Sequence, residues 1–151
     1  MPNPTGRFRT FMLCVFKSLS FGGIAHADAP PFDLPVDCLN GECEIVHYVD
    51  HDAGPEIRDY ACGTTTYNGH RGTDFAIPDE ATMLSGVAVR AIADGTVTAL
   101  REGVEDIDSG RLDKDNLEGI ECGNGILIDH ANGWQSQYCH LRRGSVAVKK
   151  R

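Results

Sequence analysis

Two side chains that could bind a metal ion lie four residues apart near the middle of the chain. They are His70 and Asp74, which offer the nitrogen and oxygen donors that zinc accepts in proteins. In an extended strand, residues i and i+4 project from one face about 13 Å apart, too far to share an ion. The chain must therefore bend between them, and Gly72 is the residue that would allow the bend. On composition alone, an ordinary surface turn is the favoured interpretation.

Four segments in a fixed order give His70 and Asp74 a functional context. In chain order these segments are residues 70–74, 87–97, 123–130 and 138–141. Their succession resembles the lysostaphin/LytM-type zinc metallopeptidases, which cut peptide cross-links in bacterial cell walls. The resemblance covers roughly residues 63–151, and the ordered set is far more specific than any one segment.

The resemblance implies a zinc metalloendopeptidase that hydrolyses peptide bonds of peptidoglycan through a zinc-activated water. It makes His70 and Asp74 zinc ligands and places His140 beside the metal as a catalytic residue. There His140 would hydrogen-bond the tetrahedral intermediate or transfer a proton. On spacing alone, His140 would instead be a strand histidine packed beside Tyr138. His130, which opens a turn, is expected to be structural.

The third zinc ligand of this family is the second histidine of a His-x-His motif near the end of the domain. The sequence reaches Arg151 without this motif, so we expect an incomplete ligand set and missing C-terminal strands. Two interpretations stay open: a truncated fragment of an active enzyme, or a non-catalytic relative that acts as a wall-binding or regulatory module. The strand-like residues 145–151 favour truncation. Such a chain should bind zinc weakly and hydrolyse little.

Residues 1–27 have the features of an export signal. Arg7 and Arg9 precede an apolar segment at residues 11–16, and Ala-His-Ala at residues 25–27 offers a cleavage site. We therefore expect a cleaved signal peptide and a periplasmic or secreted mature protein. No segment reaches the roughly twenty uninterrupted apolar residues of a transmembrane helix.

The cysteines are typical of an oxidising compartment, where such residues usually pair. Cys38 and Cys43 bracket a turn-like tetrapeptide and are predicted to form a local disulfide. The pairing among Cys62, Cys122 and Cys139 stays open, and their odd number predicts one free thiol or a partner elsewhere. Zinc binding by cysteines is the competing interpretation, but no Cys-x-x-Cys spacing supports it.

The charge of the chain argues against nucleic acid as a partner. With 22 acidic and 14 basic residues, the formal net charge is -8 at pH 7, whereas nucleic acid requires a basic face. Many of the acidic residues lie in residues 102–121, which faintly resemble a calcium-binding EF-hand loop. The loop glycine falls at the fifth position instead of the sixth. A solvated acidic loop is the favoured interpretation.

Alternating apolar residues and turn signals predict an all-β domain with an antiparallel sheet over residues 63–151. One hairpin is predicted between residues 87–93 and 96–100, and another between residues 126–130 and 134–140. The resemblance specifies a lysostaphin-like fold of barrel-sandwich type, with a groove on which His70, Asp74 and His140 converge.

The residues before this domain are rich in proline and aspartate. Residues 28–62 are therefore predicted to form an extended arm, with one strand at residues 44–49. His47 and His51 lie in this arm, outside the family-like region, and are expected to be exposed or hydrogen-bonded histidines instead of metal ligands. Residues 79–84 could form one helical turn.

Overall fold

The computed structural model describes residues 28–36, 43–108 and 119–151. The predicted signal peptide, Cys38 and part of the acidic loop lie outside the described residues. Cys43 is disulfide-bonded, but the predicted pairing with Cys38 is not among the described features. No helix in the described ranges is long and apolar enough to cross a membrane.

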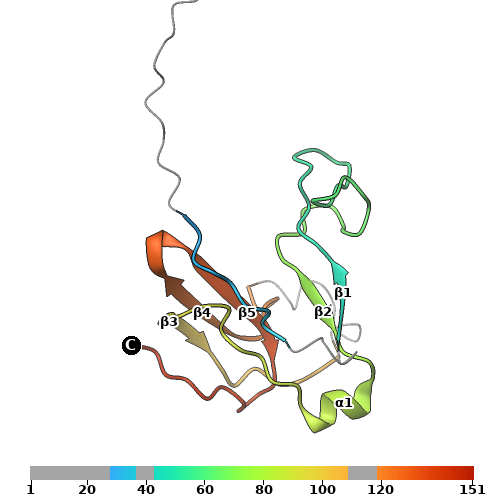
Figure 1. Ribbon diagram of the computed structural model, residues 1–151. Helices are drawn as coiled ribbons and strands as arrows, with labels where there is room; N and C mark the ends of the chain where they lie inside the picture. The colour runs from blue at the N-terminus through green and yellow to red at the C-terminus, as the bar shows by residue number, and fades with distance from the viewer. Residues whose placement is uncertain (1–27, 37–42, 109–118) are drawn as a thin grey trace, which may run out of the picture.

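The described residues form two antiparallel sheets and one short helix (Figure 1). The two-stranded sheet pairs β1 with β2, and the three-stranded sheet has the order β3-β4-β5. The strands are β1 (Glu44–His47), β2 (Asp74–Ala76), β3 (Gly95–Arg101), β4 (Asn124–His130) and β5 (Gln135–Leu141). The prediction of a mostly β fold with antiparallel pairing is therefore confirmed, while barrel closure and a groove stay predictions.

The hairpin of β4 and β5 forms where the sequence predicts it. A 3-10 turn, η3 (Ala131–Gly133), joins the two strands, and Asn132 within it has a φ of 59°. Asparagine and glycine tolerate this left-handed region better than other residues, so the Asn132-Gly133 pair suits the turn. Val97 of β3 and Ile128 of β4 are opposite each other in the register and are both buried. The central strand β4 therefore contributes to the small apolar core of the sheet.

The hairpin predicted between residues 87–93 and 96–100 is wrong. Residues 96–100 do form a strand, but β3 pairs with β4 instead of with the segment before it. That segment pairs with the N-terminal arm, because Val89 forms an isolated bridge with Val36 and Arg90 N–H donates to the Pro35 carbonyl. Residues 87–93 form no strand beyond the isolated bridge at Val89. A short turn signal does not determine which segment is the partner of a strand.

The predicted helical turn is present as α1 (Glu80–Ser85). Asp79 is its N-cap and accepts a hydrogen bond from Thr82 N–H, which satisfies a donor left free in the first turn. At the other end, the Arg142 guanidinium donates to the carbonyls of Met83 and Leu84. The segment after β5 is thus attached to the helix.

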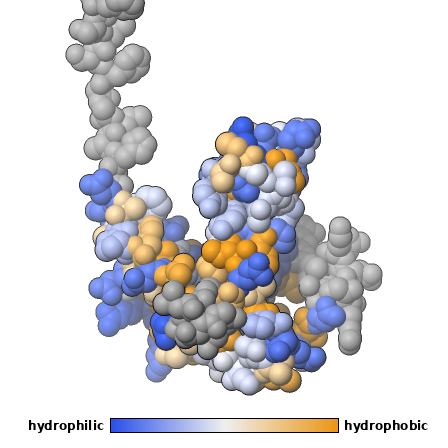
Figure 2. All heavy atoms as spheres, turned by 45° about the vertical axis from the view of Figure 1, so that its right-hand side comes forward, coloured by the Kyte–Doolittle hydropathy of each residue, from blue (hydrophilic) through white to orange (hydrophobic). Residues whose placement is uncertain are grey.

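The described residues bury few apolar side chains. Val36, Val97 and Ile128 are the buried hydrophobic residues among them, and none of the described large side chains is fully buried. Figure 2 shows apolar residues reaching the surface on the face that it presents. The exposed large hydrophobic residues include Leu34, Tyr60, Met83 and Leu84. Hydrogen bonds and disulfides therefore contribute a large share of the order of the described residues.

A cavity of about 400 Å³ lies between β3 and the C-terminal segment. It is lined by Gly95, Thr96, Val97, Val148, Lys149 and Arg151. None of the candidate site residues lines it, so this cavity does not correspond to the predicted substrate groove.

Candidate metal centre

Two histidines and one aspartate come together at the two-stranded sheet. His70 Nε2 lies 3.2 Å from Asp74 Oδ1, and His47 Nδ1 lies 3.2 Å from Asp74 Oδ2. We call His47, His70 and Asp74 the histidine–aspartate cluster. The two carboxylate oxygens of Asp74 therefore face different imidazole rings.

The strand register explains why His47 reaches Asp74. His47 and Asp74 are Cα partners across the antiparallel pair of β1 and β2, next to an irregularity in the register between Ile45 and His47. Side chains of directly opposed residues lie within contact distance on one face of a sheet. His70 comes from the turn that leads into β2, four residues before Asp74.

The His70 ring is held rigidly, with one nitrogen facing the carboxylate. Its exposed fraction is 8%, its Nδ1 lies 2.9 Å from the Tyr48 carbonyl oxygen, and the Tyr67 ring stacks on it at 4.3 Å. Because a carbonyl only accepts hydrogen bonds, Nδ1 must carry the proton. In the neutral ring, the lone pair on Nε2 then faces Asp74 Oδ1. The separation of 3.2 Å suits either a hydrogen bond from a protonated ring or a cation shared by Nε2 and Oδ1.

The chain bends between His70 and Asp74, as expected, but the bend does not use a left-handed conformation at Gly72. Gly72 does not have a positive φ. A Cβ at this position would contact only His70 Nε2, at 3.8 Å. The left-handed residue is Gly69, with a φ of 75°. The special backbone conformation therefore lies before His70, and the role assigned to Gly72 is not supported.

Two aspartates that the sequence analysis did not single out organise the loop before His70. Asp59 is buried and accepts hydrogen bonds from the N–H groups of Ala61, Gly63 and Thr65. Asp50 accepts from the N–H groups of Asp52, Arg58 and Gly69. Since Gly69 immediately precedes His70, the Asp50 carboxylate helps to fix the position of the histidine.

These hydrogen bonds lower the pKa of both carboxyl groups. The N–H of Gly63 is the main cause for Asp59, followed by those of Thr65 and Ala61, while burial opposes the shift. For Asp50 the main cause is the N–H of Asp52, followed by that of Gly69. Backbone donors favour the charged form of a carboxyl group, so the loop is most stable when both aspartates are ionised.

We expect the Asp59→Asn variant to be less stable than the wild type at pH 7, with the difference shrinking in acid. An amide has one acceptor oxygen, whereas both Asp59 oxygens accept N–H donors. Because folding lowers the pKa, the stabilisation is complete above the ordinary value of 3.8 and is lost as the pH falls through the folded value. Urea unfolding from pH 7 to pH 2 measures this. An Asp33→Asn variant is the control, and a difference that is constant with pH would contradict the prediction.

His140 lies at the end of β5 in an unusual backbone conformation. Its φ is 58° and its side chain is exposed. Ser136 and Tyr138 share the half-buried face of β5, as the alternation predicts, but His140 departs from this face. The register of β4 against β5 is irregular between Asn124 and Ile126, opposite this end of the strand. Non-glycine residues with positive φ concentrate at functional sites.

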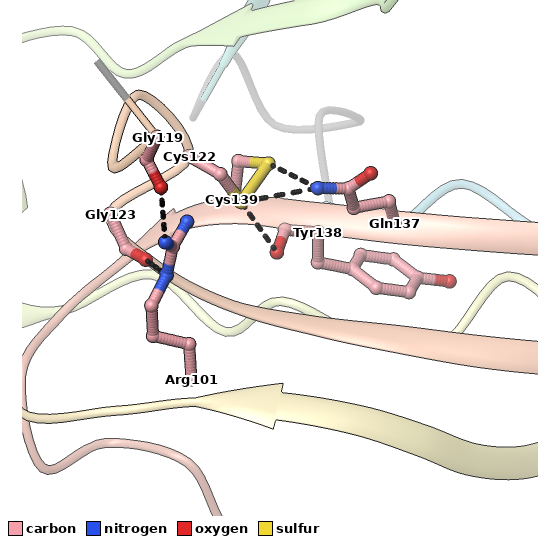
Figure 3. The surroundings of a disulfide bond; sticks show 7 residues. All are labelled: Arg101, Gly119, Cys122, Gly123, Gln137, Tyr138 and Cys139. Atoms are coloured by element: carbon pink, nitrogen blue, oxygen red, sulfur yellow. Dashed lines mark hydrogen bonds between the residues drawn. A yellow bond between two sulfur atoms is a disulfide. The ribbon is translucent and has the colours of Figure 1, made fainter. Parts of the chain in front are cut away.

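A disulfide between Cys122 and Cys139 holds the backbone next to His140 (Figure 3). The His140 N–H donates to the Cys122 carbonyl at 2.9 Å, and the Gln137 amide donates to both sulfur atoms. Arg101 donates to the carbonyls of Gly119 and Gly123, as the same view shows. Cys62 is the free thiol among the described cysteines, so the open question of pairing among these three residues is answered.

No hydrogen bond or ion pair in the described part of the chain joins His140 to His70 or Asp74. Their convergence on one groove therefore stays a prediction. His130, by contrast, is buried and uses both ring nitrogens, toward the Asp94 carbonyl and the Ser136 hydroxyl. This agrees with the structural role expected for His130.

Comparison with known protein families identifies the family of the segment that contains His70, Asp74 and His140. The model of peptidase family M23 matches residues 68–151, which is more than half of the chain. The chain belongs to peptidase family M23. Comparisons with curated proteins and with solved structures gave no significant match.

Membership in family M23 gives the general chemistry of the domain. M23 peptidases are generally metalloendopeptidases that hydrolyse peptidoglycan, and they typically depend on zinc. The chain is therefore assigned to the hydrolases, with a substrate that lies outside the cytoplasm. The disulfide between Cys122 and Cys139 fits that compartment.

The two ligands expected for an M23 domain fit zinc in type and spacing. Zinc bonds of 2.0–2.2 Å at a tetrahedral angle place neighbouring donor atoms about 3.3–3.5 Å apart, close to the 3.2 Å between His70 Nε2 and Asp74 Oδ1. The bond from His70 Nδ1 to a backbone carbonyl is the usual support of a zinc-binding histidine. The set is incomplete, because no group of three or more His, Cys, Asp or Glu side chains within the described ranges is arranged to hold a metal ion.

His47 is a hydrogen-bonded histidine, as the sequence predicts, but the sequence did not indicate that its partner is Asp74. His47 lies outside the segment that matches family M23, and it is 27 residues from Asp74. The strand predicted at residues 44–49 contains this histidine, and such a strand needs a partner strand. Nothing in the sequence identified β2 as that partner.

Proposed function

We propose that the chain is a periplasmic or secreted zinc metalloendopeptidase that hydrolyses peptide bonds of bacterial peptidoglycan. The observation that supports this most strongly is the arrangement of His70 Nε2 and Asp74 Oδ1, 3.2 Å apart, with the other His70 nitrogen bound to the Tyr48 carbonyl. Family membership independently favours the same chemistry. The export-signal features of residues 1–27 and the disulfide support the location outside the cytoplasm.

In this proposal His70 and Asp74 hold the zinc ion. Zinc supplies Lewis-acid activation of a water molecule and of the peptide carbonyl when it is bound. The His70 ring is buried and stacked on Tyr67, so it presents its nitrogen in one orientation. A fixed ligand limits the positions available to the reacting groups, which is a large part of catalysis.

His140 is proposed as the catalytic histidine that faces the substrate. Its exposed side chain and left-handed backbone support this role, as does its position in the family-like segment 138–141. A histidine there would donate a hydrogen bond to the negative charge that develops on the carbonyl oxygen, or pass a proton to the leaving amine.

The alternative function is a non-catalytic module that binds the cell wall. The observation that favours it is the incomplete donor set within the described ranges. The third ligand that the resemblance implies, from a His-x-His motif, does not occur in residues 1–151. The intact pair of His70 and Asp74, with its supporting contacts, favours the peptidase.

The test is hydrolysis of purified peptidoglycan by the full gene product. We expect new free amino groups to appear, to stop appearing after chelation, and to return with zinc. Calcium is the control, because it prefers six to eight oxygen ligands and should not restore hydrolysis. Binding to peptidoglycan without new amino groups would favour the wall-binding module, and hydrolysis that resists chelation would contradict the zinc mechanism.

A further inference from the structure

We propose that His47 is a positioning residue for the metal ligand Asp74, supplied by a strand that precedes the M23 segment. The inference rests on the proposed zinc site and extends it to the N-terminal arm. It starts from the contact of 3.2 Å between His47 Nδ1 and Asp74 Oδ2.

The two oxygens of the Asp74 carboxylate face different partners. Oδ1 faces His70 Nε2, where an ion would be shared, and Oδ2 faces His47. An ionised carboxylate only accepts hydrogen bonds, so His47 Nδ1–H is the donor. By holding Oδ2, His47 fixes the rotation of the carboxylate and keeps Oδ1 directed toward the metal position.

This contact matters because the Asp74 side chain is much more exposed than the His70 ring that it faces. Its exposed fraction is 45%, against 8% for the His70 ring. The buried histidine is fixed by Tyr48 and Tyr67, whereas His47 supplies the contact that orients the aspartate. Hydrogen-bonding partners of metal-binding carboxylates are a recognised determinant of metal affinity.

The backbone and the neighbouring rings hold His47 in place. Its Cα is the register partner of Asp74 across β1 and β2. Its ring makes edge contacts with Tyr67 at 5.4 Å and with His70 at 6.0 Å. The first strand of the arm thus belongs to the metal centre, although it lies outside the segment that matches family M23.

The experiment measures zinc affinity by competition with a chromogenic chelator. We expect His47→Ala to lower the affinity about 10–100-fold, the range typical of such supporting partners. His47→Asn should restore most of the affinity, because the amide nitrogen of asparagine is as many bonds from Cα as Nδ1 of histidine. His51→Ala is the control, an exposed histidine four residues further along the chain. Circular dichroism of every variant checks folding.

Thermal unfolding in the absence of zinc separates positioning from a general structural effect. His47→Asn and His47→Ala should then unfold alike and differ only in zinc affinity. Equal affinities for His47→Ala and His51→Ala would overturn the proposal. So would an Asn variant as weak as the Ala variant, which would indicate direct ligation by the ring. Absence of zinc binding in the unmodified protein would refute the zinc site itself, and this inference with it.

Discussion

In the full gene product, replacing His70 with alanine is expected to abolish zinc binding and peptidoglycan hydrolysis together. The variant removes a nitrogen donor that is already oriented, since Nδ1 is bound to the Tyr48 carbonyl and the ring is stacked on Tyr67. Asp74 alone cannot hold the ion in place. The loss should exceed the roughly 100-fold that removal of a supporting partner can cause, because a ligand bonds directly to the metal.

Zinc content after dialysis at a buffered free zinc concentration measures the first effect, and release of amino groups from peptidoglycan measures the second. His51→Ala should leave both unchanged, since that exposed side chain lies outside the cluster. His70→Gln is a stricter variant, because it retains a polar group of similar reach. Hydrolysis that survives His70→Ala would show that the metal site lies elsewhere.

The second large effect is expected from removal of the disulfide between Cys122 and Cys139. Replacing both residues with serine should lower the free energy of unfolding by about 3 kcal/mol, which is the value for a closed loop of about 15 residues. The separation here is 17 residues. The same variant should impair hydrolysis, because the hydrogen bond from His140 N–H to the Cys122 carbonyl lies beside the bridge.

Cys62→Ser provides the matched control for this experiment. Cys62 is an exposed free thiol, so its replacement should change neither stability nor hydrolysis. Denaturant unfolding under oxidising conditions gives the stability of each protein. If the double serine variant were as stable as the Cys62→Ser protein, the disulfide would have no structural role. If its hydrolysis were unchanged, the proposed link between the bridge and His140 would be wrong.

Features that depend on neighbours in the sequence could be predicted. The pairing of β4 with β5 follows from a three-residue turn between two alternating segments. The helical turn follows from Asp79, an N-cap residue, ahead of α1. His70 and Asp74 are four residues apart, so one bend suffices to bring them together. In each case the chain offers few alternative partners.

Features that depend on distant partners could not be predicted. β3 pairs with β4, across the acidic loop, instead of with the nearer segment before it. His47 meets Asp74 over 27 residues. Asp50 reaches Gly69 over 19 residues. A pattern of residue types shows that a strand or a carboxylate needs a partner, but the identity of the partner depends on the register of the whole fold.

The small two-stranded sheet has a consequence for how the protein survives outside the cytoplasm. All three members of the histidine–aspartate cluster lie on or beside β1 and β2, and a two-stranded sheet is marginally stable by itself. If zinc binds only the ordered sheet, the order of that sheet and the occupancy of the site form one equilibrium. A hundredfold excess of zinc over its dissociation constant would then stabilise the sheet by about 2.7 kcal/mol. Resistance to proteolysis in the 44–76 region would therefore rise and fall with the free zinc concentration of the compartment.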